Sequence, residues 1–262
     1  MFPVFELLGR SVGLFQIMLL CAIFSSGIYA CRLSVKFKYD YTDIIIFSLI
    51  SFAGAVIGSN FLYVLVNYRN LIFVFYNLNL FENIFDVFKY IFGGTVFYGG
   101  LLGGVLTGFL LIKKNIIFEK YADIAVASIP LFHFFGRIGC FLGGCCYGIP
   151  CEFGFIYKYN PIIEANGITR FPVQLLEAVL NIVLFFLLNH LLRNGKFKNK
   201  LIYIYLSIYA IGRFFIEYLR GDAYRGIWFV FSTSQLISII IILFISFKII
   251  LYKLDIYMTG KK

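Results

Sequence analysis

The sequence predicts an all-α, polytopic integral membrane protein, and three observations support this fold class: composition, continuous apolar segments and the placement of basic residues. Hydrophobic residues make up 61% and charged residues 14% of the 262-residue chain. A soluble domain of this size could not bury that much apolar surface. The apolar segments do not alternate with a period of two, which excludes an outer-membrane β-barrel and leaves α-helices as the spanning elements.

Seven apolar segments approach the ~20 residues that a helix needs to cross a bilayer. They cover residues 11–31, 43–66, 96–112, 124–142, 173–192, 201–219 and 227–252. We therefore expect about seven transmembrane helices in a single domain that covers residues 1–262.

Basic residues predict the orientation of these helices. Fourteen of the 23 Lys and Arg residues follow the first, third and fifth segments or lie in the tail: Arg32, Lys36, Lys38, Lys113, Lys114, Lys120, Arg193, Lys196, Lys198, Lys200, Lys248, Lys253, Lys261 and Lys262. Seven spans with the N-terminus outside and the C-terminus in the cytoplasm place all of them on the cytoplasmic side. The net charge of +10 is then mostly an orientation signal, so no nucleic-acid partner is expected.

This orientation makes residues 67–95 and 142–172 extracytoplasmic loops. Both are long enough to carry short interfacial helices, and residues 78–92 space their apolar side chains three and four apart, as in an amphipathic surface helix. A plain connector packed on the bundle is an equal alternative for that segment.

Two ionisable residues, His133 and Arg137, stand four apart on the fourth segment. An arginine at membrane depth costs roughly 3 kcal/mol or more, which makes it a functional-site hypothesis by default. His133 is read either as a hydrogen-bonded structural residue or as a proton carrier. The neighbouring glycines are read either as helix-packing positions of the small-xxx-small kind or as a means of close approach to a ligand.

The sixth segment carries a polar stripe of Tyr209, Arg213, Glu217 and Arg220 on an otherwise apolar helix. Arg213 and Glu217 could form a buried ion pair that fixes helix register. Alternatively, Arg213 could hold an anion, since a guanidinium presents a fork of donors that suits a phosphate.

The third segment opens with paired glycines, Gly99-Gly100 and Gly103-Gly104, whose backbone N–H groups could approach a phosphate. Four cysteines follow the fourth segment in a C-x4-C-C-x4-C arrangement: Cys140, Cys145, Cys146 and Cys151. This is no standard zinc spacing. Small packed residues are the first interpretation, a disulfide the second and a metal or catalytic thiol a distant third.

Several motifs together resemble the bacterial prolipoprotein diacylglyceryl transferase family along most of the chain. They are residues 58–64 (GSNFLYV), residues 97–103 (FYGGLLG), the signature Gly136-Arg137-Ile138-Gly139-x-Phe141, residues 170–178 (RFPVQLLEA) and the pattern Tyr209-x3-Arg213-Phe214-x2-Glu217-x2-Arg220-x-Asp222. The resemblance implies seven spans and a bacterial cytoplasmic membrane as the location.

The resemblance also implies the reaction: transfer of a diacylglyceryl group from phosphatidylglycerol to the lipobox cysteine of prolipoproteins, with a thioether formed and glycerol phosphate released. The expected catalytic residues are Arg137 and Arg213, which would hold the phosphate, together with Glu217, Tyr209 and His133. The expected substrate-binding residues are Tyr98, Gly99, Gly100, Gly139, Cys140, Gly148 and Arg220. No metal or other cofactor is expected, because no nucleotide fingerprint or standard metal spacing is present.

The chain departs from the family pattern at four positions. Tyr98 stands where many members have histidine, Cys140 where the signature has asparagine, Cys145 where it has glutamate, and Asn60 where an arginine is found. A divergent paralogue with another acceptor is one alternative that follows. The other is a transporter or flippase for an anionic lipid, in which the arginines line a path.

Overall fold

A computed structural model describes residues 4–7, 10–68, 72, 96–114, 119–160, 162–195, 197–222, 227–228 and 230–259. Among these residues, six helices are long and apolar enough to cross a membrane. They are α1 (Leu14–Lys36), α2 (Tyr41–Val66), α6 (Glu119–Gly143), α7 (Val173–Arg193), α8 (Leu201–Ile216) with the 3-10 turn η3 (Glu217–Leu219), and α9 (Thr233–Thr259). The expected all-α, multi-pass membrane fold is confirmed.

The remaining expected span, residues 96–112, forms the 18-residue helix α5 (Phe97–Lys114). A helix of this length rises about 27 Å, slightly less than the ~30 Å hydrocarbon core. It is not among the six helices above, so the count of seven spans and the orientation that depends on it stay predictions. The amphipathic helix expected at 78–92 lies outside the described residues.

Two helices begin later than the apolar pattern suggests. The hairpin β1 (Val4–Leu7) and β2 (Arg10–Gly13) precedes α1, and the short hairpin β5 (Ile227–Trp228) and β6 (Phe231–Ser232) precedes α9. The start of α9 is fixed by a capping box, because Gln235 N donates to Ser232 Oγ at 3.2 Å while Ser232 N donates to Gln235 Oε1 at 3.0 Å. The boundary predicted at residue 227 is therefore wrong by six residues.

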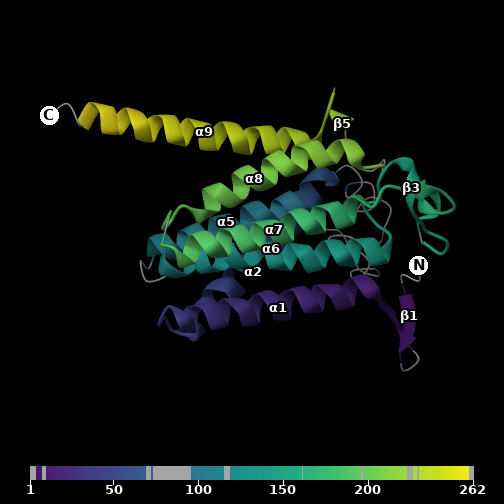
Figure 1. Cartoon of the computed structure of the whole chain (residues 1–262), viewed down its shortest axis with the longest axis horizontal. Coiled ribbons are helices and arrows are strands. Elements are labelled where there is room, and N and C mark those ends of the chain that lie inside the picture. Colours follow the sequence, from purple (N-terminus) through teal and green to yellow (C-terminus); the bar gives the residue numbers. More distant parts are fainter. Residues whose placement is uncertain are drawn as a thin grey trace. The chain divides into compact units, whose positions relative to one another are not determined.

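The loop 142–172 contains a small sheet where we expected interfacial helices. Strand β3 (Pro150–Ile156) pairs antiparallel with β4 (Thr169–Arg170), and a 3-10 turn, η2 (Ile163–Ala165), connects them. Buried Arg170 holds this loop together: its guanidinium donates to the Gly148 carbonyl at 3.2 Å and lies 4.3 Å from the Tyr147 ring centroid. In Figure 1 the sheet lies beyond the ends of α6 and α7.

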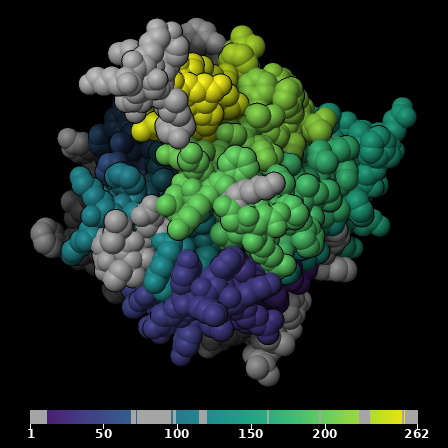
Figure 2. Space-filling view, turned by 60° about the vertical axis from the view of Figure 1, so that its left-hand side comes forward, coloured from purple at the N-terminus to yellow at the C-terminus, as the bar shows by residue number. Residues whose placement is uncertain are grey.

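The described chain separates into two compact units, one of residues 1–30 and 126–262 and the other of residues 31–125. In the first unit α6, α7 and α8 run side by side (Figure 1), and their core contains Ala127, Leu184, Leu188 and Tyr205. The green atoms of α7 adjoin the lighter green atoms of α8 on the face shown in Figure 2. The expected single domain stays a prediction.

In the second unit, glycines bring α2 and α5 into direct backbone contact. A Cβ added at Gly99 would overlap the Gly58 carbonyl oxygen, and one added at Gly103 would overlap the Gly54 carbonyl oxygen. A Cβ at Gly100 would lie 3.4 Å from the Ala55 carbonyl oxygen. Both helices thus use a small-xxx-small pattern. Packing between α2 and α5 explains why position 99 requires glycine, and the expected role of Gly99 and Gly100 in substrate binding stays a prediction.

This packing makes Gly99→Ala a sensitive test of the unit. We expect the substitution to destabilise the protein by about 1–3 kcal/mol, because the new methyl group forces α2 and α5 apart. The measurement is the midpoint of thermal unfolding in detergent. Gly27→Ala in α1 is the matched control, since no atom lies within 4 Å of its added Cβ, and it should leave the midpoint unchanged or raise it. An unchanged midpoint for Gly99→Ala would contradict the close packing.

Candidate functional site

Two arginines and two glutamates from α6, α7, α8 and η3 form a buried ionic cluster in the first unit. Glu177 on α7 pairs with both arginines: its Oε1 accepts from Arg213 Nη1 at 2.6 Å, and its Oε2 pairs with Arg137 Nε. Arg213 Nη2 lies 2.6 Å from Glu217 Oε2. The side chains of Glu177, Arg213 and Glu217 are 4%, 6% and 2% exposed, against 16% for Arg137. Two positive and two negative charges therefore balance inside the helix bundle.

The fold places each of these charges on an inward face of an apolar helix. Arg213 and Glu217 are four residues apart at the junction of α8 and η3, so their side chains meet on one face. The ion pair expected there is confirmed. Ser234, in the first turn of α9, adds a further contact, since its Oγ accepts from Arg213 Nη2 at 3.2 Å. Arg213 is thus held from three helices.

Glu177 is the central residue that the sequence reasoning did not name as a site residue. It stands within the matching segment 170–178, yet it received no role. A signal for it was present: it is the one acidic residue in the apolar segment 173–192. The rule that drew attention to Arg137, that a charge at membrane depth needs a partner or a function, applies equally to Glu177.

Arg137 and Arg213 differ in how many of their guanidinium nitrogens contact other side chains. Within the described part of the chain, its ion pair with Glu177 involves Nε. The two terminal nitrogens, Nη1 and Nη2, remain as parallel donors on the more exposed of the two arginines. A fork of this kind matches two oxygens of one phosphate.

His133 and Tyr209 lie next to this cluster in an aromatic group between α6 and α8. His133 Nδ1 is 2.9 Å from the Tyr205 hydroxyl, and its ring centroid is 5.5 Å from that of Tyr209. Because His133 precedes Arg137 by about one helical turn, the imidazole and the guanidinium project from the same face of α6.

Arg220 and Gly148 meet at a backbone junction close to the end of α8. The two residues form an isolated antiparallel bridge, and Ile149 N donates to the Leu219 carbonyl at 3.0 Å. A Cβ at Gly148 would overlap the Phe171 carbonyl oxygen, so the junction requires glycine. Arg220 pairs with Asp222 through Nε at 2.9 Å and Nη2 at 2.5 Å. A carboxylate therefore already holds one edge of the Arg220 guanidinium.

Gly139 packs against α1, because a Cβ there would lie 3.0 Å from Met18 Cβ and 3.3 Å from a Phe15 ring atom. Helix packing accounts for a glycine at this position, and the expected role of Gly139 in substrate binding stays a prediction. Tyr98 belongs to α5, but its side chain lies outside the described residues, so its expected role stays a prediction.

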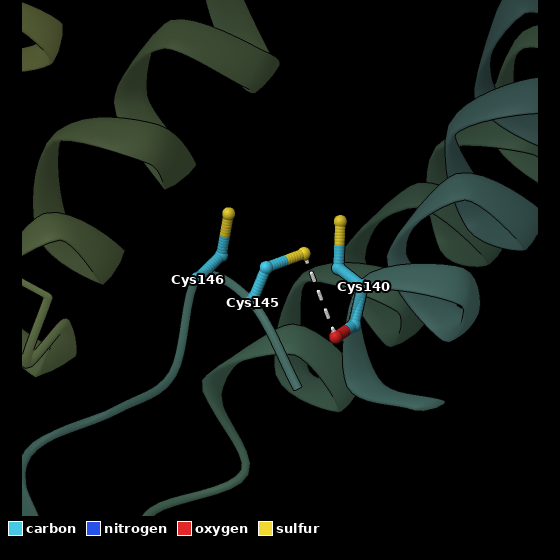
Figure 3. Close-up of side chains that lie close together, drawn as sticks. All are labelled: Cys140, Cys145 and Cys146. Carbon is cyan, nitrogen blue, oxygen red and sulfur yellow. Dashed lines mark hydrogen bonds between the residues drawn. The ribbon is translucent and has the colours of Figure 1, made fainter. Parts of the chain in front are cut away.

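Three of the four cysteines in the segment 140–151 converge at the end of α6, as Figure 3 shows. The sulfur atoms of Cys140, Cys145 and Cys146 all lie within 4.8 Å of one another, and Cys151 does not belong to this group. Cys145 Sγ also donates to the Cys140 carbonyl oxygen at 3.8 Å. The pKa of the Cys146 thiol lies well below its usual range, because the thiols of Cys140 and Cys145 hydrogen-bond to it and Arg220 and Arg137 are nearby. All three cysteines are free thiols.

Comparison with known proteins gives consistent matches over nearly the whole chain. The family model described as prolipoprotein diacylglyceryl transferase matches residues 3–251. The chain is 33% identical to the phosphatidylglycerol–prolipoprotein diacylglyceryl transferase of Clostridium tetani, with 91% of this chain and 92% of that protein covered. It is 31% identical to the protein of the same name from Clostridium botulinum strain Hall, with 86% of each covered. It is 28% identical to the second such transferase of Clostridium perfringens, with 91% and 90% covered.

Proposed function

Because this chain belongs to the prolipoprotein diacylglyceryl transferase family, we propose that Arg137 binds the phosphate of its donor lipid and that the buried ionic cluster holds Arg137 in place. The protein is an enzyme that transfers a diacylglyceryl group from phosphatidylglycerol to prolipoproteins, the first step of lipoprotein maturation. The acceptor atom is the thiol of the lipobox cysteine, and the enzyme works in the bacterial cytoplasmic membrane.

The chemistry requires a cation at the leaving phosphate. The acceptor thiol gives up its proton, and the thiolate attacks the glyceryl carbon that carries the phosphate. The carbon–sulfur bond forms as the carbon–oxygen bond breaks, and glycerol phosphate leaves with the bonding electron pair. Negative charge therefore grows on the phosphate oxygens in the transition state. Nη1 and Nη2 of Arg137 suit this charge, because preorganised donors in a site of low dielectric stabilise it without further reorganisation.

Arg213 acts in this proposal as a positioning residue. Its terminal nitrogens already serve Glu177, Glu217 and Ser234. Glu177 is shared between Arg213 and Arg137, so fixing one carboxylate oxygen on Arg213 also fixes the oxygen that orients Arg137. The sequence-based expectation that both arginines touch the phosphate is thereby narrowed to Arg137. This shared carboxylate is the observation that carries the proposal.

The acceptor proton needs a base, and Glu217 and His133 are the two expected candidates. Glu217 pairs with Arg213, and protonating it would break that buried ion pair. His133 does not belong to an ion pair of this cluster and projects from the same face of α6 as Arg137, so we propose His133 as the base. Tyr209, whose ring lies tilted beside the imidazole, can hydrogen-bond the lipid head group. Arg220 can attract the anionic lipid at the membrane surface.

Two substitutions separate the base from the structural partner. We expect His133→Asn to lower kcat by about 10²–10⁴-fold, because the proton acceptor is removed. Glu217→Gln should lower the thermal unfolding midpoint as well as the activity, because it breaks the buried ion pair with Arg213. The measurement is the initial rate of thioether formation, with the unfolding midpoint recorded for both variants. Equal and small losses of rate in the two variants would remove both residues from the role of base.

The activity is tested directly with purified protein, phosphatidylglycerol and a synthetic lipobox peptide. Mass spectrometry should detect the peptide with a diacylglyceryl group on its cysteine, and a peptide with serine in place of that cysteine should stay unmodified. If no thioether forms with folded protein while a relative's enzyme is active, the divergent-paralogue alternative would replace the proposal. Lipid movement between the leaflets of a vesicle, without thioether formation, would favour the flippase alternative.

A further inference from the structure

The convergence of Cys140, Cys145 and Cys146 is the most distinctive chemical feature that the proposed reaction does not use. Cys140 lies in the last turn of α6, and the other two thiols come from the turn that follows the helix (Figure 3). In the figure the Cys145 sulfur points between the other two residues, toward Cys140. Sequence spacing gave no reason to expect this, because C-x4-C-C is not a standard zinc pattern.

The distances suit a single soft cation. Zinc–sulfur bonds are about 2.3 Å long, so two sulfurs of one tetrahedral site stand roughly 3.8 Å apart. The three sulfurs here lie within 4.8 Å of one another. Side-chain rotations that shorten each sulfur–sulfur separation by about 1 Å or less would therefore bring all three sulfurs to coordination distance.

The turn that presents these thiols is firmly held. Cys146 has φ of +54°, a left-handed conformation that a non-glycine residue rarely adopts. The backbone just before Cys146 is fixed by buried amides: Asn160 Nδ2 donates to the Gly144 carbonyl at 2.6 Å, and Gln174 Nε2 donates to the Cys145 carbonyl at 2.8 Å. A site whose supporting groups are already satisfied does not have to be ordered when a ligand binds.

The surrounding charge favours a thiolate complex. Arg137 and Arg220 lie near Cys146, although each is also paired with a carboxylate, Glu177 and Asp222 respectively. Three thiolates around one divalent cation carry a net charge of only −1, which suits a site beside these partly balanced guanidinium groups. Thiolates also select soft cations over magnesium or calcium.

We propose that Cys140, Cys145 and Cys146 form a binding site for one thiophilic divalent cation of the zinc class. Binding replaces three thiol protons with the cation and releases those protons to solvent. Three protein ligands leave a fourth coordination position for water or for another thiol. The proposal does not depend on the transferase reaction.

Cadmium is the probe for this site, because its thiolate complexes absorb in the ultraviolet. The full-length protein, purified in detergent and kept reduced under argon, is titrated with Cd²⁺ alone and without donor lipid or peptide. We expect one bound Cd²⁺ per chain, competition by Zn²⁺ and a charge-transfer absorbance. Cys140→Ser, Cys145→Ser and Cys146→Ser should each raise the Kd at least about tenfold, since loss of a ligand costs more than loss of a supporting group. Cys151→Ser is the matched control and should bind as the parent protein does.

A second measurement uses the unsubstituted protein, in case a serine variant fails to fold. Thiol alkylation with and without Cd²⁺, mapped by mass spectrometry, should show protection of Cys140, Cys145 and Cys146 among the six cysteines. Absence of the absorbance, binding that persists in the triple serine variant, or protection of other cysteines alone would each overturn the proposal. A Cys140–Cys146 or Cys140–Cys145 disulfide that persists after reduction would overturn it as well.

Discussion

Replacing Arg137 with lysine is expected to lower kcat of diacylglyceryl transfer by at least about 100-fold, the effect of removing one preorganised donor at a developing negative charge. The lysine ammonium is a point charge. It can pair with Glu177 or reach the phosphate, whereas the guanidinium does both by using Nε for Glu177 and its terminal nitrogens for the lipid. Most of the loss should appear in kcat, because the charge on the phosphate grows as the carbon–oxygen bond breaks.

The rate of thioether formation on a lipobox peptide measures this effect, with the thermal unfolding midpoint recorded for each variant. Arg137→Ala should be at least as impaired as Arg137→Lys. Arg32→Lys is the matched control: Arg32 is an exposed arginine near the end of α1, and its replacement should change neither the rate nor the midpoint. If Arg137→Lys kept more than half of the parent rate, bidentate phosphate binding by Arg137 would be wrong.

The sequence was sufficient for the fold class and for contacts within one helix. Continuous apolar segments gave the helices, and the four-residue spacing of Arg213 and Glu217 gave their ion pair. Contacts between helices could not be read in this way. The segment 173–192 carries polar residues on one face, Gln174, Glu177 and Asn181, spaced three and four apart. That spacing does not specify which residues of other helices the face meets, so the contacts of Glu177 with Arg137 and Arg213 could not be predicted.

The contacts of the glycines and cysteines also could not be predicted from sequence spacing. Paired glycines in a membrane segment can expose backbone donors to a ligand or allow a neighbouring helix to pack closely. Both uses have the same spacing in the sequence, so spacing cannot distinguish them. In the structure Gly99 and Gly103 admit α2. The meeting of three thiols depends on a left-handed turn at Gly144 and Cys146, a backbone conformation that no pattern of residue types specified. The start of α9 is different, because the capping box Ser232-x-x-Gln235 was readable but lay inside an apolar run.

The largest effect on stability is expected from Glu177→Gln. The amide keeps the shape of the side chain but removes the charge that balances two buried guanidinium groups. Breaking a buried ion pair by removing one partner typically costs about 3–5 kcal/mol, because the remaining charge is left uncompensated in a medium of low dielectric. Here Arg137 and Arg213 would also repel each other. We therefore expect a lower unfolding midpoint together with loss of transferase activity.

A double substitution distinguishes charge balance from a simple loss of packing. Arg213→Met should itself destabilise the protein, since it leaves Glu177 and Glu217 with one fewer cation. When Glu177→Gln is added to Arg213→Met, the cluster again has equal numbers of positive and negative charges. The double variant should lose less stability than the sum of the two single losses, by about 0.5–3 kcal/mol. Activity should stay absent, because Arg137 would no longer be oriented by a carboxylate.

The stability of these variants is measured by thermal unfolding in detergent and compared with Glu152→Gln, which changes an exposed glutamate on β3 and should have little effect. Additive losses in the double variant would mean that Glu177 contributes through shape and not through charge. In that case the two arginines would not be coupled through one carboxylate, and the positioning role of Arg213 would fail even if Arg137 still bound the phosphate. If the double variant regains part of the lost stability but no transferase activity, the result supports an ionic cluster whose function is to hold the guanidinium of Arg137 in place.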